Sequence, residues 1–172
     1  MLKSLGKNAA LLTTLMLSGW LIAADYPASP KAVVDAYIRA DLAGAAMSAT
    51  SWGAVQQYTQ WPAKHSWDGC LVVKAHQIGQ STETDGKATV VVSYDVVGEF
   101  DGVRVALAPR KDQLTLQLAQ QGGQWKIIGD PAKPRLLPAA TLPLLLEQLD
   151  QAKSLGDSAV VQQIEESIKA LK

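Results

Sequence analysis

The chain has 172 residues, of which 48% are hydrophobic and 19% are charged, so it can bury one full core and is too apolar for wholesale disorder. Its 16 basic residues equal its 16 acidic ones, which leaves no positive surplus for binding a nucleic-acid backbone. Cys70 is the only cysteine, so an internal disulfide and a multi-cysteine metal site are both excluded. We expect one domain with a small appendage, and neither a cofactor nor a nucleic-acid partner.

Residues 1–24 have the organisation of a secretory signal peptide. Lys3 and Lys7 precede an apolar run that ends at Ala24, just before the sequence DYPASP. From Ala9 to Ala24 the run has 16 residues, whereas a membrane-spanning helix needs roughly 20. The sequence therefore predicts export with cleavage after Ala24, into the periplasm if the host is a Gram-negative bacterium. A retained membrane anchor is the alternative, and the absence of a cysteine near Ala24 argues against a lipid anchor.

Helices are predicted between this segment and the first strand. Ser29 followed by Pro30 is a favoured helix start, and apolar residues then recur at helical spacing as far as Gly44. A second helical segment is predicted over residues 45–58, and Pro62 would end it. These segments would supply the helical cover that a half-buried sheet requires.

Two-residue alternation predicts an antiparallel sheet in the middle of the chain. Mostly apolar side chains occupy the even positions from 88 to 96 and from 114 to 118, and most of the intervening side chains are polar. The segment CLVVKAHQI predicts a strand before them, and QWKIIG predicts a returning strand after Gly122-Gly123. The segment VRVALA, before Pro109, is either a short strand or the continuation of a bent one.

Residues 131–140 and 141–172 complete the chain. The first segment is rich in proline and predicts an irregular linker. The second predicts a helical hairpin, in which Thr141 and Asp157 begin the two helices and Gly156 ends the first. We expect the apolar seams of these helices to pack on each other and on the sheet. A docking or dimerisation element is the alternative.

The order of helices and strands resembles that of the nuclear transport factor 2-like superfamily. The segment SPKAVVDAYIRADLAG is similar to the first helix of many members, including ketosteroid isomerases and polyketide cyclase-like proteins, and GGQWKIIGD is similar to their final strand. The resemblance covers about residues 30–130 and implies a cone-shaped α+β fold, in which a curved antiparallel sheet wraps around N-terminal helices. We expect the corresponding domain to span residues 25–130. The C-terminal helical hairpin lies outside the resemblance.

The isomerase branch of that superfamily implies a set of catalytic residues. Tyr37 lies where the branch places a tyrosine that donates a hydrogen bond to negative charge developing on a substrate oxygen. Asp68 and Asp95 are the candidates for the carboxylate base and the protonated carboxylic acid that the branch also uses, although the sequence before Asp68 departs from its pattern. An isomerase, cyclase or dehydratase is therefore one hypothesis, and a purely structural Tyr37 in the core is its alternative.

A group of aromatic residues forms the second candidate site. Four of them fall within sixteen positions, and the spacing of the three tryptophans does not place them on one helical face. Aromatic rings among glutamines and a histidine are typical of small-molecule pockets and of protein-binding surfaces. Packing of the tryptophans into the cone is the alternative. The candidate binding residues are Trp52, Tyr58, Trp61, His65 and Trp67, together with His76.

The leading functional hypothesis is an exported envelope protein without enzymatic activity. Many members of the superfamily that the chain resembles lack catalytic residues and serve as binding or association modules. We expect binding of a small ligand or a partner protein through the pocket of the cone and its aromatic mouth, without a stable membrane anchor after cleavage. No spacing of histidines and carboxylates predicts a metal site. Homodimer formation is left open.

Overall fold

The computed structural model describes residues 26–61 and 67–172. The predicted signal peptide and His65 lie outside these described residues. The elements, in chain order, are α1 (Pro30–Leu42), the short 3-10 helix η1 (Ala45–Met47), α2 (Gly53–Gln56), β1 (Cys70–Thr84), β2 (Lys87–Phe100), β3 (Val105–Gln121), β4 (Gln124–Ile128), β5 (Arg135–Leu136), α3 (Pro138–Leu155) and α4 (Ser158–Ala170).

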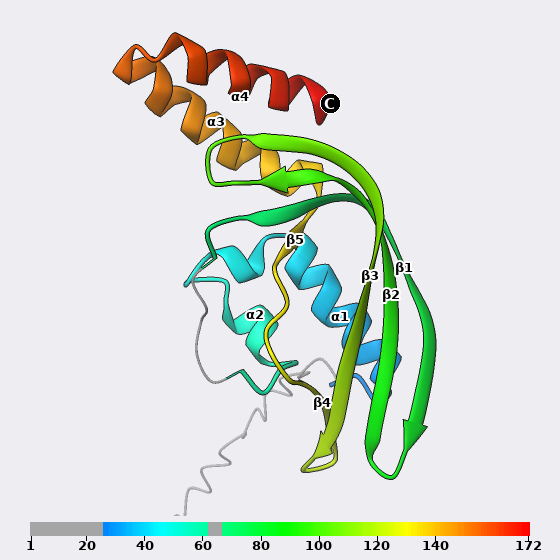
Figure 1. Ribbon diagram of the computed structural model, residues 1–172. Helices are drawn as coiled ribbons and strands as arrows, with labels where there is room; N and C mark the ends of the chain where they lie inside the picture. The colour runs from blue at the N-terminus through cyan, green and yellow to red at the C-terminus, as the bar shows by residue number, and fades with distance from the viewer. Residues whose placement is uncertain (1–25, 62–66) are drawn as a thin grey trace, which may run out of the picture.

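The strands form one five-stranded sheet in the order β4-β3-β2-β1-β5. Neighbouring strands are antiparallel except for β5, which pairs with β1 in parallel at Leu71 and Val72. The three long strands curve strongly, so the sheet wraps around α1, and α3 and α4 lie over its bent end (Figure 1). This architecture confirms the predicted α+β fold with a cone-shaped curved sheet, N-terminal helices and a C-terminal helical hairpin.

The side chains of β2 alternate between a face of the sheet that packs on α1 and a face that is turned away from it. Val90, Val92 and Tyr94 are buried with the side chains of α1 and define the inner face, while Val91 and Ser93 point to the outer face. Towards the bent end, the register between β2 and β3 shifts between Val96 and Gly98. Beyond this bulge, α3 and α4 bury a second hydrophobic cluster that includes Phe100.

Residues 105–108 of the segment VRVALA belong to one long strand, because β3 begins at Val105 and continues through Pro109. Proline cannot donate a backbone hydrogen bond, so sheets accept it at edges and bulges. Both conditions hold here, since β4 pairs only with residues 117–121 of β3 and the bulge lies beside Pro109. Residues 105–116 of β3 therefore have one edge without a strand partner among the described residues.

Helix α1 begins and ends as predicted. Ser29 accepts the backbone N–H of Ala32 at 3.3 Å, and Pro30 opens the first turn. Gly44 follows the helix with a φ of +88°, a conformation that favours glycine and turns the chain away from the helix axis.

The prediction of one continuous second helix over residues 45–58 is wrong. The chain forms η1 and the four-residue helix α2 instead. Between them, the hydroxyl of Ser51 donates to Ala45 O at 3.1 Å, and the hydroxyls of Ser48 and Thr50 lie 2.8 Å apart. Such local side-chain bonds compete with the backbone bonds of a continuous helix.

The segment before α3 is more ordered than the predicted irregular linker. Arg135 and Leu136 form β5, and α3 begins at Pro138 rather than at Thr141. Proline is favoured at the first helical position, because the N–H group that it lacks has no helical partner there. Thr141 lies inside the first turn and donates its hydroxyl to Leu137 O at 3.0 Å.

The two closing helices meet at the predicted turn. Asp157 accepts the backbone N–H of Val160 at 3.1 Å and begins α4 directly after Gly156. Leu145 of α3 and Ile164 of α4 are fully buried in the second hydrophobic cluster. No helix in the described part of the chain is long and apolar enough to cross a membrane.

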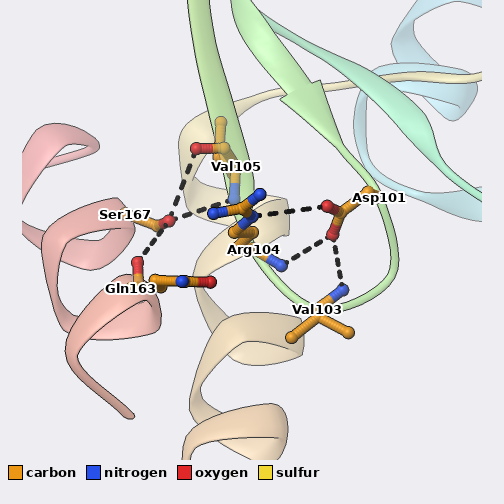
Figure 2. A network of polar contacts seen from close by, with 6 residues as sticks. All are labelled: Asp101, Val103, Arg104, Val105, Gln163 and Ser167. Atoms are coloured by element: carbon orange, nitrogen blue, oxygen red, sulfur yellow. Dashed lines mark hydrogen bonds and ion pairs between the residues drawn. The ribbon is translucent and has the colours of Figure 1, made fainter. Parts of the chain in front are cut away.

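A polar network also holds this hairpin to the sheet (Figure 2). Ser167 on α4 accepts the backbone N–H of Val105 at 3.0 Å and donates to Gln163 O at 2.9 Å. In the turn that leads into β3, Asp101 accepts the backbone N–H of Arg104 at 2.9 Å. Helix α4 therefore occupies the edge of β3 at the first residue of the strand.

Candidate functional site

Aromatic side chains fill the space between α1 and the inner face of the sheet. Trp52 and Trp61 are 7% and 5% exposed, and their rings stack with centroids 6.3 Å apart. Trp61 also meets the ring of Tyr37 edge-on at 5.8 Å and donates its indole N–H to Gly129 O at 3.0 Å. Protein side chains therefore occupy the region in which the sequence predicted a pocket.

The other aromatic candidates lie nearer the surface and at separate places. Tyr58 packs on Tyr26 with ring centroids 5.9 Å apart, and the amine of Lys126 lies 4.4 Å from the centre of the Tyr26 ring. Trp67 and Asp68 line a different depression of about 490 Å³. The structure does not gather these residues with the buried tryptophans into one surface, and their role in binding stays a prediction.

The three residues suggested for catalysis do not share a site. Tyr37 is 2% exposed beneath the inner face, and burial raises the pKa of its phenol well above the usual value. Asp95 lies on the outer face, where a hydrogen bond from Lys111 lowers the pKa of its carboxyl group. A carboxylic acid that stays protonated needs a raised pKa, which is the opposite shift. Asp68 is exposed beside Trp67.

A buried polar cluster that joins α1 to β5 was missed by the sequence reasoning. Asp41 Oδ2 accepts the backbone N–H of Arg135 at 3.1 Å. The guanidinium group of Arg135 lies 4.7 Å from the centre of the Tyr94 ring and 3.5 Å from Asp112 Oδ2. A signal was present in the sequence, because Asp41 falls on the apolar stripe of α1 one turn after Tyr37.

This cluster is closed to solvent. Asp41, Arg135 and Tyr94 are 2%, 6% and 1% exposed. Burial raises the pKa of Asp41 to about 7, and the hydrogen bond and positive charge of Arg135 oppose the rise. Shifted pKa values often mark catalytic groups, but a substrate cannot reach these atoms. The cluster therefore joins elements of the fold and does not form an open active site.

A polar depression of about 830 Å³ lies over β1, β2 and β3. The strand register places two rows of side chains next to each other on the outer face of the sheet. One row consists of an amide, a hydroxyl and an amide, and the other contains an ion pair. The rows are Gln77–Ser93–Gln113 and Ala75–Asp95–Lys111, and we name this surface the outer-face depression.

Two other residues that line the outer-face depression have side chains on the opposite side of the sheet. The ring of His76 lies 6.3 Å from that of Tyr94, and Asp112 contacts Arg135. His76 and Asp95 therefore lie on adjacent strands but leave opposite faces, so they do not form an acid–base pair. The outer-face depression offers hydrogen-bond donors, acceptors and one ion pair.

The outer-face depression reaches the unpaired edge of the sheet. Lys111 and Gln113 line it and belong to residues 105–116 of β3, which have no partner strand on that side within the described ranges. The hydroxyl of Ser167 accepts the backbone N–H of Val105, but Val105 lies six residues before Lys111, outside the outer-face depression. A sheet edge of this kind leaves backbone N–H and C=O groups without a strand partner, and here that edge lies beside the polar rows.

Two further kinds of chemistry are relevant to the fold: metal binding by histidine, cysteine and carboxylate side chains, and reaction of the Cys70 thiol. Residues 26–61 and 67–172 contain no group of three or more histidine, cysteine, aspartate or glutamate side chains that could hold a metal ion. Cys70 is fully buried in β1, and burial raises the pKa of its thiol to about 12. A thiol in such a place is protonated and shielded from reagents.

Comparison with known families corrects the resemblance proposed from the sequence. A family model described as "Lipoprotein LpqB, N-terminal domain" matches residues 25–140, about two thirds of the chain. No curated protein and no solved structure matches. The assignment to the nuclear transport factor 2-like superfamily is therefore wrong, and the catalytic roles expected for Tyr37, Asp68 and Asp95 lose the resemblance on which they rested. A lipoprotein family agrees with an exported envelope protein, although Cys70, the only cysteine in the sequence, is fully buried in β1.

Proposed function

This chain belongs to the family of the lipoprotein LpqB N-terminal domain, and on that premise we propose that it is a non-enzymatic association module of the cell envelope. It binds a partner protein through the outer-face depression and the neighbouring edge of β3. The signal-peptide pattern of residues 1–24 supports a location beyond the cytoplasmic membrane, which is the periplasm if the host is a Gram-negative bacterium.

The packing inside the cone is the observation that carries this proposal. Trp52 and Trp61 stack in the space that a small ligand would need, and Tyr37 closes it from α1. Ligand pockets usually enclose most of the ligand surface. The outer-face depression is instead an accessible surface, since the side chain of Lys111 on its border is 82% exposed. An accessible polar surface suits a protein partner better than a small molecule.

The chemistry of the outer-face depression suggests the kind of partner segment. Gln77, Ser93 and Gln113 each carry a hydrogen-bond donor and an acceptor, and the charges of Asp95 and Lys111 cancel. The backbone of the neighbouring β3 edge adds donors and acceptors with the repeat of a strand. We therefore expect an extended, polar segment of the partner to bind by strand addition.

Site-specific photo-crosslinking in the native envelope tests this proposal. A photoreactive amino acid at Gln113, or at Gln77 in the same row, is expected to give one protein adduct of defined mass. Gln117 is the matched control, because it lies on the same strand and the same face, is exposed, and is outside the outer-face depression. We expect no adduct of that mass from Gln117.

Equal adducts at Gln113 and Gln117, or none at Gln113, would contradict the proposal. Native mass spectrometry of the full chain addresses the competing pocket hypothesis. A small molecule that co-purifies with the wild-type protein, and is lost in Trp61→Phe, would favour a ligand inside the cone.

A further inference from the structure

We propose that Asp41 and Arg135 form a pH-sensitive latch, which fastens the segment between β4 and α3 to the end of α1 and loosens as the carboxyl group of Asp41 becomes charged. The latch is independent of the outer-face depression and concerns how the two halves of the fold are held together. It joins residues that are 94 positions apart in the sequence.

The segment before α3 is fastened at three successive places. The N–H of Leu71 donates to Pro134 O at 2.9 Å, and the N–H of Leu137 donates to the last carbonyl group of α1 at 3.0 Å. The bond from the Arg135 N–H to Asp41 Oδ2 lies between them. Of these three bonds, only the bond to Asp41 has a titratable side chain as its acceptor. A change of pH therefore alters the strength of this bond before that of the other two.

The surroundings of Asp41 compensate its charge incompletely. Arg135 supplies positive charge but shares its guanidinium group with Asp112 and the ring of Tyr94. Neither Asp41 Oδ1 nor Arg135 Nε has a hydrogen-bond partner among the described residues. A charge that is buried without full pairing is costly. The groups around Asp41 are Tyr37 on α1, Cys70 on β1, Tyr94 on β2 and Arg135 on β5, with Asp112 on β3 beyond Arg135 and the Lys133–Glu99 ion pair beyond Cys70.

The direction of the pH effect follows from this burial. In the closed latch, burial raises the pKa of Asp41 from 3.8 to about 7. When the segment opens and the carboxyl group reaches water, its pKa returns towards the lower value. Between the two values the closed form holds a proton that the open form releases. A rise in pH through this range therefore shifts the equilibrium towards the open form.

The latch lies at the root of the hairpin. Leu136, next to Arg135, is buried in the hydrophobic cluster beneath α3 and α4, and α3 begins at Pro138. In Figure 1 the yellow segment that carries β5 runs beside α1 and leads directly into α3. Loosening the latch therefore removes one of the two bonds named above that hold the root of the hairpin to α1, which couples the attachment of the hairpin to pH.

Hydrogen exchange of the Arg135 amide, corrected for its intrinsic rate at each pH, tests the latch in the full chain. In the wild-type protein we expect the protection factor of this amide to fall by up to about tenfold per pH unit between about pH 5 and 7. In Asp41→Asn it stays constant, because asparagine does not titrate. Asp35→Asn is the matched control, since Asp35 is an accessible carboxylate on the same helix, and it keeps the wild-type slope.

Two results overturn the proposal: a wild-type protection factor that is independent of pH, or an equal slope in Asp41→Asn. If the asparagine variant fails to fold, the ¹³C shift of the Asp41 carboxyl carbon in the wild-type protein decides the matter. A titration midpoint near neutral pH supports the latch, and a midpoint below about pH 5 overturns it.

Discussion

Trp52 and Trp61 stack with their ring planes 20° from parallel, and this pair closes the space between α1 and the sheet. The two rings lie on either side of α2 in the sequence, so the stack fixes a segment that has little regular structure of its own. Aromatic pairs contribute about 0.5–1.5 kcal/mol beyond the burial of their area. The stack therefore anchors the segment around α2 to the core, although this segment contains only a short helix.

Removing one ring of this stack is expected to destabilise the whole domain. Trp61→Ala leaves a cavity and removes the indole bond to Gly129, so we expect the free energy of unfolding to fall by about 3–5 kcal/mol. Trp61→Phe fills most of this cavity, so we expect a smaller fall in the free energy of unfolding than in Trp61→Ala. Urea unfolding measures both, with Leu155→Ala at an 84% exposed position as a control that changes by less than about 0.5 kcal/mol. A loss below about 1 kcal/mol in Trp61→Ala would contradict this account of the core.

Two glycines are expected to respond in opposite ways to the same substitution. A side-chain carbon at Gly98 would overlap the backbone carbonyl of Ala106 on β3, so Gly98→Ala is expected to cost roughly 1–3 kcal/mol. Gly53 on α2 has no atom in the way, so Gly53→Ala is expected to be neutral or to stabilise by up to about 1 kcal/mol. Thermal unfolding of the two variants compares them directly. Equal shifts in midpoint would mean that β2 and β3 do not approach closely at this bulge.

The fold was predictable where local pattern encodes it. The alternation in residues 87–98 predicted β2, and the Ser29-Pro30 pair predicted the start of α1. The pairing of β5 with β1 was not predictable, because two residues carry no periodicity and their partner strand lies far away in the sequence. The superfamily assignment failed for a related reason. An order of elements and two short similar segments are shared by unrelated α+β proteins.

The candidate site depended on information that spacing does not contain. Aromatic residues were chosen by type, but burial assigned Trp52 and Trp61 to the core. The outer-face depression arises from the register of three strands, which places Gln77, Ser93 and Gln113 in one row. Register is fixed by turns and bulges and not by the residues of one strand alone. These polar residues therefore gave no signal in the linear sequence.

Asp41 is expected to make the folded protein less stable as the pH rises towards neutrality. Its pKa is raised by burial from 3.8 to about 7, so the folded protein binds more protons than the unfolded chain between these values. The stabilisation is complete below the lower value and is lost as pH rises through the upper one, by at most about 1.4 kcal/mol per pH unit. Asp95, whose pKa is lowered by Lys111, acts in the opposite direction and at lower pH. Urea unfolding at several pH values should show this slope in the wild-type protein and lose it in Asp41→Asn. Identical pH profiles for the two proteins would contradict the prediction.

Two serines of the hairpin provide a matched test of how it is fastened to the sheet. Ser167 and Ser154 both donate to a carbonyl group one turn earlier, at 2.9 and 2.8 Å, but Ser167 also accepts the N–H of Val105. Ser167→Ala leaves that buried N–H without its acceptor, so we expect a loss of about 1–3 kcal/mol and faster hydrogen exchange at Val105. Ser154→Ala is expected to change stability by less than about 0.5 kcal/mol. If the two variants behaved alike, the bond to β3 would contribute nothing, and apolar packing alone would hold α4 on the sheet.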